Sequence, residues 1–165
     1  ERGKTEPNEI LDDLRAEIKK AFTDKDTNNE MNDGMDCALC KFDLTNNTLD
    51  DAAANNSIVV VRNNEVMHLT GDKMPVGKGE KLLPFAEFEI LPEENATIYI
   101  YTDGYADQFG GIKGKKFKYK QLNEFLLTYS TKEMSQQLES LTVQFDSWKG
   151  DLEQVDDVCV IGIKL

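Results

Sequence analysis

Long apolar segments are missing from this sequence. The longest apolar runs have the length of a strand, and none approaches the roughly 18 residues that a membrane-spanning helix needs. The N-terminus, ERGKTEPNEI, also lacks the apolar core of a signal peptide. We therefore expect no direct membrane insertion and a cytoplasmic location. Because the sequence does not start with methionine, we expect a piece of a longer protein.

Basic residues are also few. The sequence has 19 Lys and Arg against 31 Asp and Glu, so its formal net charge is −12. Nucleic acids are bound through clustered basic side chains, so this balance argues against a nucleic-acid partner. With 39% apolar and 30% charged residues, the composition is that of a globular protein, and we expect one domain over residues 1–165.

Cysteine and histidine, the usual zinc ligands, are scarce. Cys37 and Cys40 form a CALC motif, but the surrounding residues alternate like a strand, which places the two side chains on opposite faces. No second pair exists, and Cys159 stands alone. We interpret the three cysteines as reduced, small core residues. The single histidine, His68, lies in EVMHL and is interpreted as a strand residue rather than an acid–base group.

Apolar residues three or four positions apart predict three helices, over residues 6–22, 119–129 and 131–149. In the first, we expect Ile10, Leu14 and Ile18 to pack on a sheet. In the last, a seam of apolar residues is interpreted as core. Its members are Met134, Leu138, Leu141, Phe145 and Trp148.

Alternating apolar residues predict strands between and after these helices. The predicted strands cover residues 35–44, 48–54, 57–61, 65–69, 85–90, 97–101 and 155–165. We expect hairpins across RNN (62–64) and across LPEENA (91–96), and a polar loop over 23–33. This order of elements predicts an α+β domain with largely antiparallel sheets packed against helices.

Two of these strands carry acids at their ends. Asp103 follows the strand at 97–101, and Asp156 and Asp157 stand near the start of the final strand. If these strands are antiparallel neighbours about 5 Å apart, the acids meet at one edge of the sheet and can share one cation. Hard cations such as Mg²⁺ and Mn²⁺ prefer such oxygen ligands, and Gly104 allows close backbone approach. The alternative is that these acids only form turns, since Asp-Gly is a common turn pair.

The motifs TDGYAD (102–107) and VDDVCVIGI (155–163) together resemble the C-terminal motifs of the metal-dependent protein phosphatases (PPM, type 2C). More narrowly, they resemble the bacterial branch typified by stage II sporulation protein E and the stress-response phosphatases, and GDKMPVG (71–77) and ADQFGGIKGKKFKYKQL (106–122) extend the resemblance. It covers nearly the whole chain. GGIKGKK (110–116) lacks the spacing of a phosphate-binding P-loop and is interpreted as a mobile flap near the site.

The resemblance implies a β-sandwich flanked by helices, with two Mn²⁺ or Mg²⁺ ions that activate a water to hydrolyse phosphoserine or phosphothreonine. It makes Asp103 and Asp156 metal ligands. Asp107 matches an outer acid that some relatives use for a further metal, while Asp157, which stands where many relatives carry Asn, and Gly104 are weaker candidates for an additional site. The implied partners are a phosphorylated bacterial signalling protein and an upstream sensor domain, which could tether the protein to a membrane. Homodimerisation is left open.

One segment of the family pattern has no counterpart. Relatives carry an earlier strand whose Asp bridges both metals, followed by a GHG-like stretch, and NDGMD (32–36) aligns with a later strand instead. We therefore expect the C-terminal two-thirds of a phosphatase domain, with its N-terminal strands missing and with little activity alone. The alternative function is a non-catalytic binding or regulatory module that keeps the fold.

Overall fold

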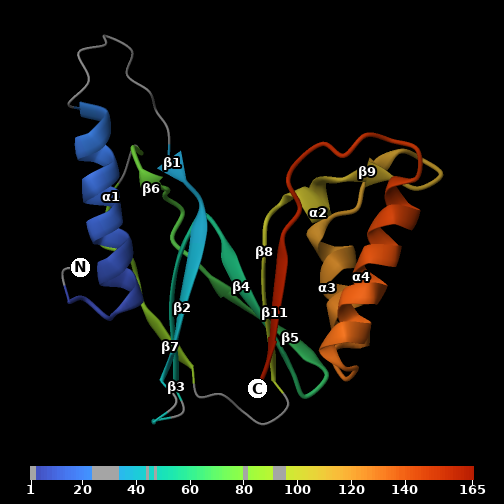
Figure 1. The fold of residues 1–165 in the computed structure, drawn as a ribbon, viewed down its shortest axis with the longest axis horizontal. Helices are drawn as coiled ribbons and strands as arrows, with labels where there is room; N and C mark the ends of the chain where they lie inside the picture. Colours follow the sequence, from blue (N-terminus) through green and yellow to red (C-terminus); the bar gives the residue numbers. More distant parts are fainter. Residues whose placement is uncertain (1–2, 24–33, 44, 47, 80–81, 91–95) are drawn as a thin grey trace. The chain divides into compact units, whose positions relative to one another are not determined.

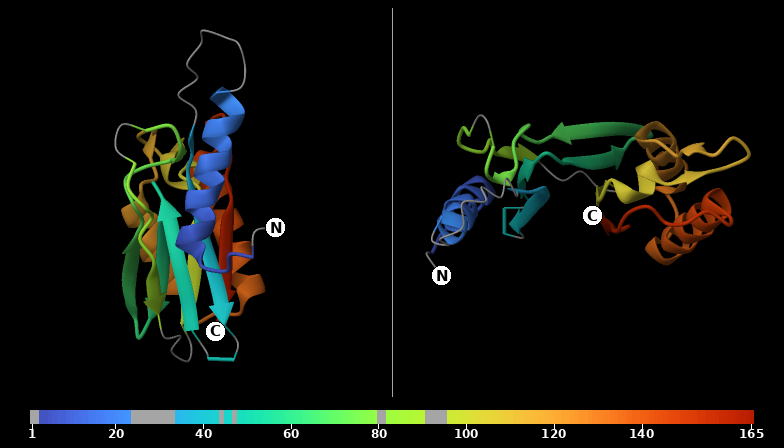
Figure 2. Two further views of the ribbon diagram at one scale, coloured as in Figure 1. Left: turned by 90° about the vertical axis from the view of Figure 1, so that its left-hand side faces the viewer. Right: turned by 90° about the horizontal axis from the view of Figure 1, so that it is seen from above.

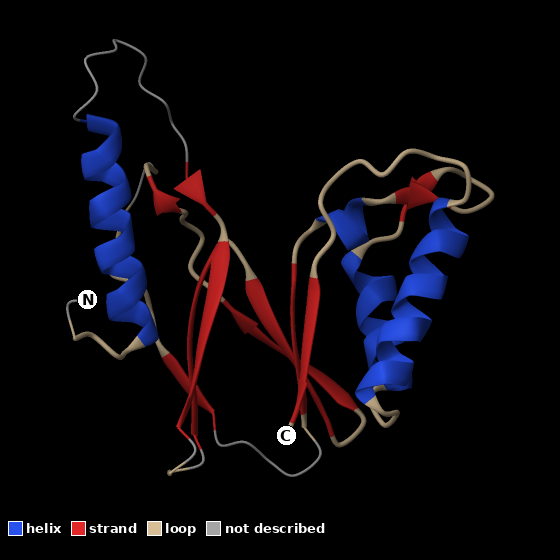
Figure 3. Cartoon of the chain, in the orientation of Figure 1, coloured by secondary structure: helices blue, strands red, loops and turns tan. Residues whose placement is uncertain are grey.

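The computed structural model describes all residues except 1–2, 24–33, 44, 47, 80–81 and 91–95. The chain divides into two compact units, one made of residues 1–58 and 69–92, the other of residues 59–68 and 93–165. The first helix is followed by a run of strands, and the other helices come between these strands and the last one, an α+β order (Figures 1 and 3) that confirms the predicted class. A single domain over the whole chain stays a prediction. Nearly all of the predicted polar loop at 23–33 lies outside the described residues.

The first unit is a three-stranded antiparallel sheet covered by a helix. The strands β2 (Cys37–Asp43), β3 (Thr48–Ala54) and β7 (Phe88–Ile90) follow the order β2-β3-β7, and β2 and β3 are joined in register, with Cys40 opposite Asp51. Two short strands, β1 (Gly34–Met35) and β6 (Val76–Gly77), pair with each other. The pair β1–β6 was not predicted, because two residues are too few to show an alternation.

Helix α1 (Pro7–Thr23) confirms the predicted helix and part of its buried stripe, because Ile18 packs against the core cluster of the first unit. Leu11 is 2% exposed and packs with a cluster that includes Ala52 and Phe85, whereas the predicted core residue Leu14 is 37% exposed. The helix lies along β2 and β3 (Figure 2, left). Its buried face also includes Arg15, which a search for apolar residues does not identify.

Arg15 is buried with partners for both terminal nitrogens and for the face of its guanidinium. One nitrogen donates to the carbonyl of Leu83 at 2.9 Å, the other pairs with Asp12, and the plane lies 4.1 Å from the ring centre of Phe85. Buried charges are retained only when paired and hydrogen-bonded in this way. The helix is therefore rotated toward Leu11 and Arg15, and Leu14 is left at the edge.

The second unit contains a four-stranded antiparallel sheet in the order β11-β8-β4-β5. Its strands are β4 (Ser57–Arg62), β5 (Glu65–Thr70), β8 (Thr97–Tyr101) and β11 (Val160–Lys164), and β4 begins in the first unit. The predicted turn between β4 and β5 is confirmed: Asn63 and Asn64 have φ of 49° and 61°, as a two-residue hairpin requires.

The predicted hairpin across residues 91–96 is wrong. Strand β7 pairs with β3 in the sheet of the first unit, whereas β8 pairs with β4 and β11. The alternating pattern of residues 85–90 and 97–101 indicates two strands, but it does not identify their neighbours. The final strand also begins later than predicted, at Val160, so that Asp156 and Asp157 lie in the loop before it.

Helices α3 (Tyr119–Tyr129) and α4 (Met134–Lys149) pack on this sheet. Leu141 and Phe145 are buried as predicted, but Leu138 is 66% exposed. Gln137 is buried instead, 2% exposed, and its side-chain oxygen accepts a hydrogen bond from the hydroxyl of Tyr99 at 2.5 Å. At this point of α4, a buried hydrogen bond therefore replaces the apolar contact that the sequence pattern predicted.

The cysteines only partly match the prediction of small core residues. Cys37 and Cys40 are half-buried in β2, and burial raises the pKa of the Cys40 thiol to about 12, while Cys159 is exposed. His68 lies in β5, as predicted, and its Nε2 is 3.2 Å from the side-chain nitrogen of Asn123. In the described part of the chain, no helix is long and apolar enough to cross a membrane.

Candidate metal site

Pairing of β8 with β11 brings the candidate acids to one edge of the sheet. The strands are antiparallel, with Tyr101 opposite Val160, and the ladder continues past both strands through a 3.0 Å hydrogen bond from the backbone N–H of Thr102 to the carbonyl of Cys159. Asp103 follows one strand and Asp156 precedes the other. The neighbour relation that the sequence argument assumed is therefore confirmed.

Two contacts hold the ends of these strands together. The Thr102 hydroxyl donates to the carbonyl of Asp157 at 2.9 Å and accepts from the backbone N–H of Cys159 at 3.0 Å. Gly104 lies directly against the same segment: a Cβ built on it would be 2.4 Å from the carbonyl oxygen of Asp157. Gly104 is thus required for close approach of two backbones, since its own φ is not in the left-handed region.

The four acids differ in their surroundings. Asp103, Asp156 and Asp157 are exposed to solvent. Asp107 closes the single turn of helix α2 (Gly104–Asp107) and forms an ion pair with Lys116 at 2.8 Å. Within the residues that the structure describes, no three or more His, Cys, Asp or Glu side chains come close enough to hold a metal ion.

This donor set fits part of the coordination shell of a hard divalent cation. Mg²⁺ is commonly held through one or two carboxylates and keeps several waters, so Asp103 and Asp156 are the side chains that would hold it here. Asp107 would have to leave Lys116 to join them. The roles of Asp103, Gly104, Asp107, Asp156 and Asp157 in metal binding stay predictions.

Tyr119 is a neighbour of the site that the sequence patterns did not identify. It is the first residue of α3, is 47% exposed, and stacks on Tyr101 with ring centres 6.1 Å apart. Partial burial, and then the negative charges of Asp103 and Asp107, raise the pKa of its hydroxyl. The hydroxyl therefore stays protonated beside these acids at neutral pH. No spacing rule marks it, because the contact depends on the path of residues 102–118, which leads through α2 and a short pair of strands back to β8.

Gln108 was likewise missed. It is fully buried, its side-chain nitrogen donates to the carbonyls of Phe109 and Glu153 at 2.9 Å each, and its side-chain oxygen accepts from the N–H of Val155 at 3.3 Å. Its own carbonyl accepts a hydrogen bond from the indole of Trp148 at 3.0 Å. One side chain therefore joins the segment after Asp107 to the loop that leads to Asp156.

Comparison with known proteins identifies the family. The family model of stage II sporulation protein E (SpoIIE) matches residues 2–165. Comparison with curated protein sequences finds no significant match.

Solved structures share the fold. The SiaA-PP2C domain of Pseudomonas aeruginosa is 23% identical with a TM-score of 0.86, and the match covers 99% of this chain and 63% of that chain. The phosphatase domain of the cell fate determinant SpoIIE from Bacillus subtilis is 12% identical, with a TM-score of 0.62 and coverage of 100% and 74%. The RsbU and RsbW domains of Rv1364c from Mycobacterium tuberculosis are 14% identical, with a TM-score of 0.68 and coverage of 97% and 42%.

This chain thus spans less than two-thirds of the length of the SiaA-PP2C chain. Its match to the family model is nevertheless continuous over almost every residue, including both acid-bearing motifs. The chain belongs to the stage II sporulation protein E (SpoIIE) family and has the fold of PP2C-type phosphatase domains.

Proposed function

We propose that the chain forms part of a metal-dependent protein serine/threonine phosphatase, with Asp103 and Asp156 as ligands of a catalytic Mn²⁺ or Mg²⁺ ion. The observation that carries the proposal is the pairing of β8 with β11, which places both acids at one sheet edge where Gly104 touches the backbone of Asp157. Membership of the SpoIIE family and the PP2C-type fold support it.

The ions would supply a water of lowered pKa and would neutralise charge on the phosphoryl oxygens. The residues of this chain have positioning roles. The hydrogen bonds of Thr102 hold the two strand ends together, and Gly104 keeps the backbones close. The hydroxyl of Tyr119, protonated beside Asp103, is a donor that can bind a phosphoryl oxygen.

Two ions within about 4 Å repel each other strongly unless a bridging carboxylate lies between them. Two carboxylates at a sheet edge bind a single ion more readily than they bind a pair of ions. We therefore propose that the 165-residue chain alone hydrolyses phosphoesters slowly or not at all, while the full-length gene product is active with Mn²⁺. The substrate class proposed is a phosphorylated regulatory protein of bacterial signalling.

A non-catalytic binding module is the second candidate. It is favoured by the absence, within the described ranges, of any group of three or more metal-ligating side chains. Such a module would keep the fold and the sheet edge without turnover. The two candidates differ in the activity of the full-length gene product.

The test has two readouts. Calorimetric titration of Mn²⁺ into the 165-residue chain measures ion binding directly. Hydrolysis of para-nitrophenyl phosphate by the full-length product measures turnover. We expect Asp103→Asn and Asp156→Asn to weaken Mn²⁺ binding at least tenfold and to abolish hydrolysis, because each removes a charged ligand. Asp151→Asn, an exposed acid in the loop after α4, is the matched control and should change neither. Unchanged hydrolysis in Asp103→Asn would refute the site, and absence of any turnover in the full-length product would favour the binding module.

A further inference from the structure

Lysines are concentrated in one short segment of this acidic protein. Residues 113–120, KGKKFKYK, hold five lysines and no acid, although the chain as a whole carries a net charge of −12. All five lysines are exposed. The acidic surface already makes the protein soluble, so solubility does not explain why positive charge is gathered in one segment.

Four of the five lysines belong to a small, anchored hairpin, whereas Lys120 lies in α3 and forms an ion pair with Glu124 at 3.9 Å. Strands β9 (Phe109–Gly110) and β10 (Lys115–Lys116) pair antiparallel, and between them Ile112 is fully exposed. At the base, Phe117 is 3% exposed and packs edge-on against Trp148 with ring centres 5.3 Å apart. The N–H of Gly111 also donates to the carbonyl of Trp148 at 2.8 Å, so the hairpin is held at the C-terminal end of α4.

Packing explains the glycines at the base of the hairpin as well. A Cβ on Gly110 would lie 1.9 Å from the carbonyl oxygen of Trp148, which leaves no room for any other residue there. The hairpin therefore has a buried aromatic base and an exposed basic tip. This arrangement presents positive charge in a defined direction and does not simply bury apolar surface.

The base of the hairpin adjoins the proposed metal site. Lys116 forms the 2.8 Å ion pair with Asp107, whose N–H donates to the carbonyl of Asp103 at 2.9 Å. On the other side of Phe117, the N–H of Lys118 donates to the carbonyl of Ala106 at 2.6 Å, within α2. One helical turn thus separates Lys116 and Lys118 from the candidate metal ligand Asp103.

We infer that the hairpin of residues 109–118 is a docking surface for an acidic segment of a phosphoprotein substrate. The inference rests on the proposed function and specifies the substrate class for the same site: a phosphoserine or phosphothreonine flanked by Asp or Glu. A phosphate group carries about −1.5 to −2 charges and reaches lysines as readily as carboxylates do. Because the lysines stand beside the acids of the site, they draw the phosphorylated segment toward those acids, which alone would repel it.

A short acidic peptide fits this surface better than a larger polyanion does. Nucleic acids and anionic membranes extend well beyond a hairpin of ten residues and would meet the acidic remainder of the chain. A peptide needs only the exposed tip, where Ile112 and Phe109, 41% exposed, can cover its apolar side chains.

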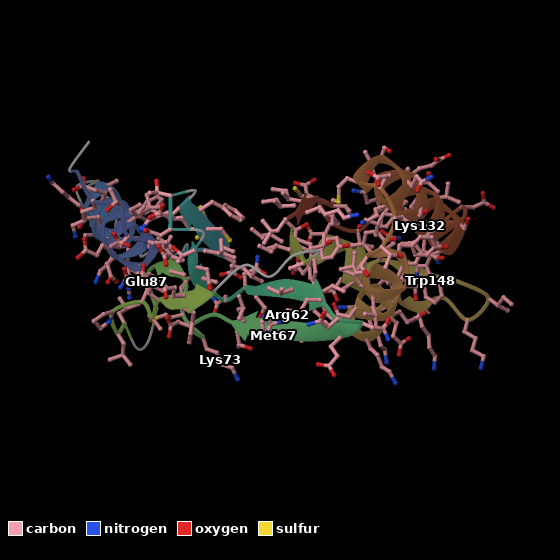
Figure 4. All side chains as sticks on the ribbon, turned by 90° about the horizontal axis from the view of Figure 1, so that it is seen from below. Arg62, Met67, Lys73, Glu87, Lys132 and Trp148 are labelled. Carbon is pink, nitrogen blue, oxygen red and sulfur yellow. The ribbon has the colours of Figure 1, made fainter. Side chains whose placement is uncertain are left out.

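The test is a binding measurement on the 165-residue chain. The variant is Lys113→Glu/Lys115→Glu, which leaves the Lys116–Asp107 ion pair intact. The matched control is Lys132→Glu/Lys164→Glu, two exposed lysines of the same unit, of which Lys132 is labelled in Figure 4. Helix α4 has 16 residues and so spans about 24 Å, with Lys132 just before its start and the hairpin at its end.

The probe is a fluorescein-labelled phosphoserine peptide with Asp and Glu on both sides, followed by anisotropy. An exposed ion pair contributes about 0.2–1 kcal/mol, so reversing two lysines should weaken binding about tenfold, with little effect of the control pair. The difference should shrink at 0.5 M salt, where the screening length falls to about 4 Å. A phosphoserine peptide with neutral flanks should bind more weakly and show a smaller difference between the two proteins, because only its phosphate then meets the lysines.

Equal affinity of the hairpin variant and the parent chain for the acidic peptide would overturn the inference. So would tighter binding of duplex DNA or phosphatidylserine vesicles than of the peptide. Hydrolysis of para-nitrophenyl phosphate by the full-length product, a substrate without flanking residues, should be unchanged by the hairpin variant. If that hydrolysis is absent throughout, the proposed function fails while the peptide measurement still decides the docking surface.

Discussion

Gly104→Ala is a direct test of the close approach between the strand ends at the candidate site. An alanine Cβ would lie 2.4 Å from the carbonyl oxygen of Asp157 and 3.0 Å from its carbonyl carbon, both backbone atoms. Real Cβ contacts of this kind are not tolerated, so one backbone has to move. The carbonyl is held by the Thr102 hydroxyl at 2.9 Å, and that hydroxyl is itself fixed by the N–H of Cys159.

The size and sign of the effect follow from two opposing contributions. Forcing an extra carbon into a packed site costs about 1–3 kcal/mol. Without the clash, alanine would be favoured over glycine in a helix by up to about 1 kcal/mol. We therefore expect the free energy of unfolding to fall by about 1–3 kcal/mol, which lowers the midpoint of thermal unfolding by roughly 2–10 °C for a chain of this size.

Thermal unfolding followed by circular dichroism measures the stability, and Mn²⁺ calorimetry measures the site. The matched control is Gly162→Ala on β11. There the added carbon would clash with the terminal methyl of Met134 at 2.6 Å, the movable end of a flexible side chain, and would meet the ring of Tyr99 only at 3.4 Å. We expect Gly104→Ala to lose Mn²⁺ affinity and stability together, and Gly162→Ala to keep both nearly unchanged. A Gly104→Ala protein as stable as the parent, or more so, would show that the two backbones are not in contact.

Two further predictions concern the first unit. Leu11→Ala should lower the free energy of unfolding by about 2–5 kcal/mol because it leaves a cavity, whereas Leu14→Ala at the exposed edge of α1 should cost less than about 1 kcal/mol; denaturant titration compares them. Burial, and then the charges of Glu87 and Asp50, raise the pKa of the Asp51 carboxyl to about 6. An acid whose pKa is raised in the folded state favours the fold in its protonated form and disfavours it once ionised. As the pH rises from about 4 to about 7, the free energy of unfolding should therefore fall by on the order of 2 kcal/mol. Asp51→Asn should remove that decline, and an unchanged pH profile would contradict the assignment.

Much of the fold was predictable because it depends on local patterns. Alternation in β2 and β8 and the continuous apolar run of β4 indicated these strands, and Asn63–Asn64 marked the turn between β4 and β5. Strand pairing was less accessible: residues 85–90 and 97–101 are consecutive strands that join different sheets. Pairing is decided by contacts between distant residues, which periodicity along the chain does not contain.

Around the candidate site, the position of Asp103 just after a strand was predictable, whereas the burial of a polar side chain was not. Gln108 is a polar residue directly after Asp107, yet its three side-chain hydrogen bonds allow complete burial. Arg15 in α1 is the same case in the first unit. A pattern that ranks residues by hydrophobicity assigns both to the surface, because it cannot count the partners that the fold provides.

The pairing of β8 with β11 also determines when the site can form during folding. Tyr101 and its partner Val160 are 59 residues apart in the chain, with α3 and α4 between them. Contacts over such separations require closure of a long loop and tend to form late, after the local helices and hairpins. In an intermediate that contains α3, α4 and the β4–β5 hairpin, β8 and β11 would not yet be paired. Asp103 and Asp156 would therefore not yet lie at the same sheet edge. Affinity for a divalent ion would then appear only in the last step of folding. The ion would stabilise the completed sheet and would not help to assemble it.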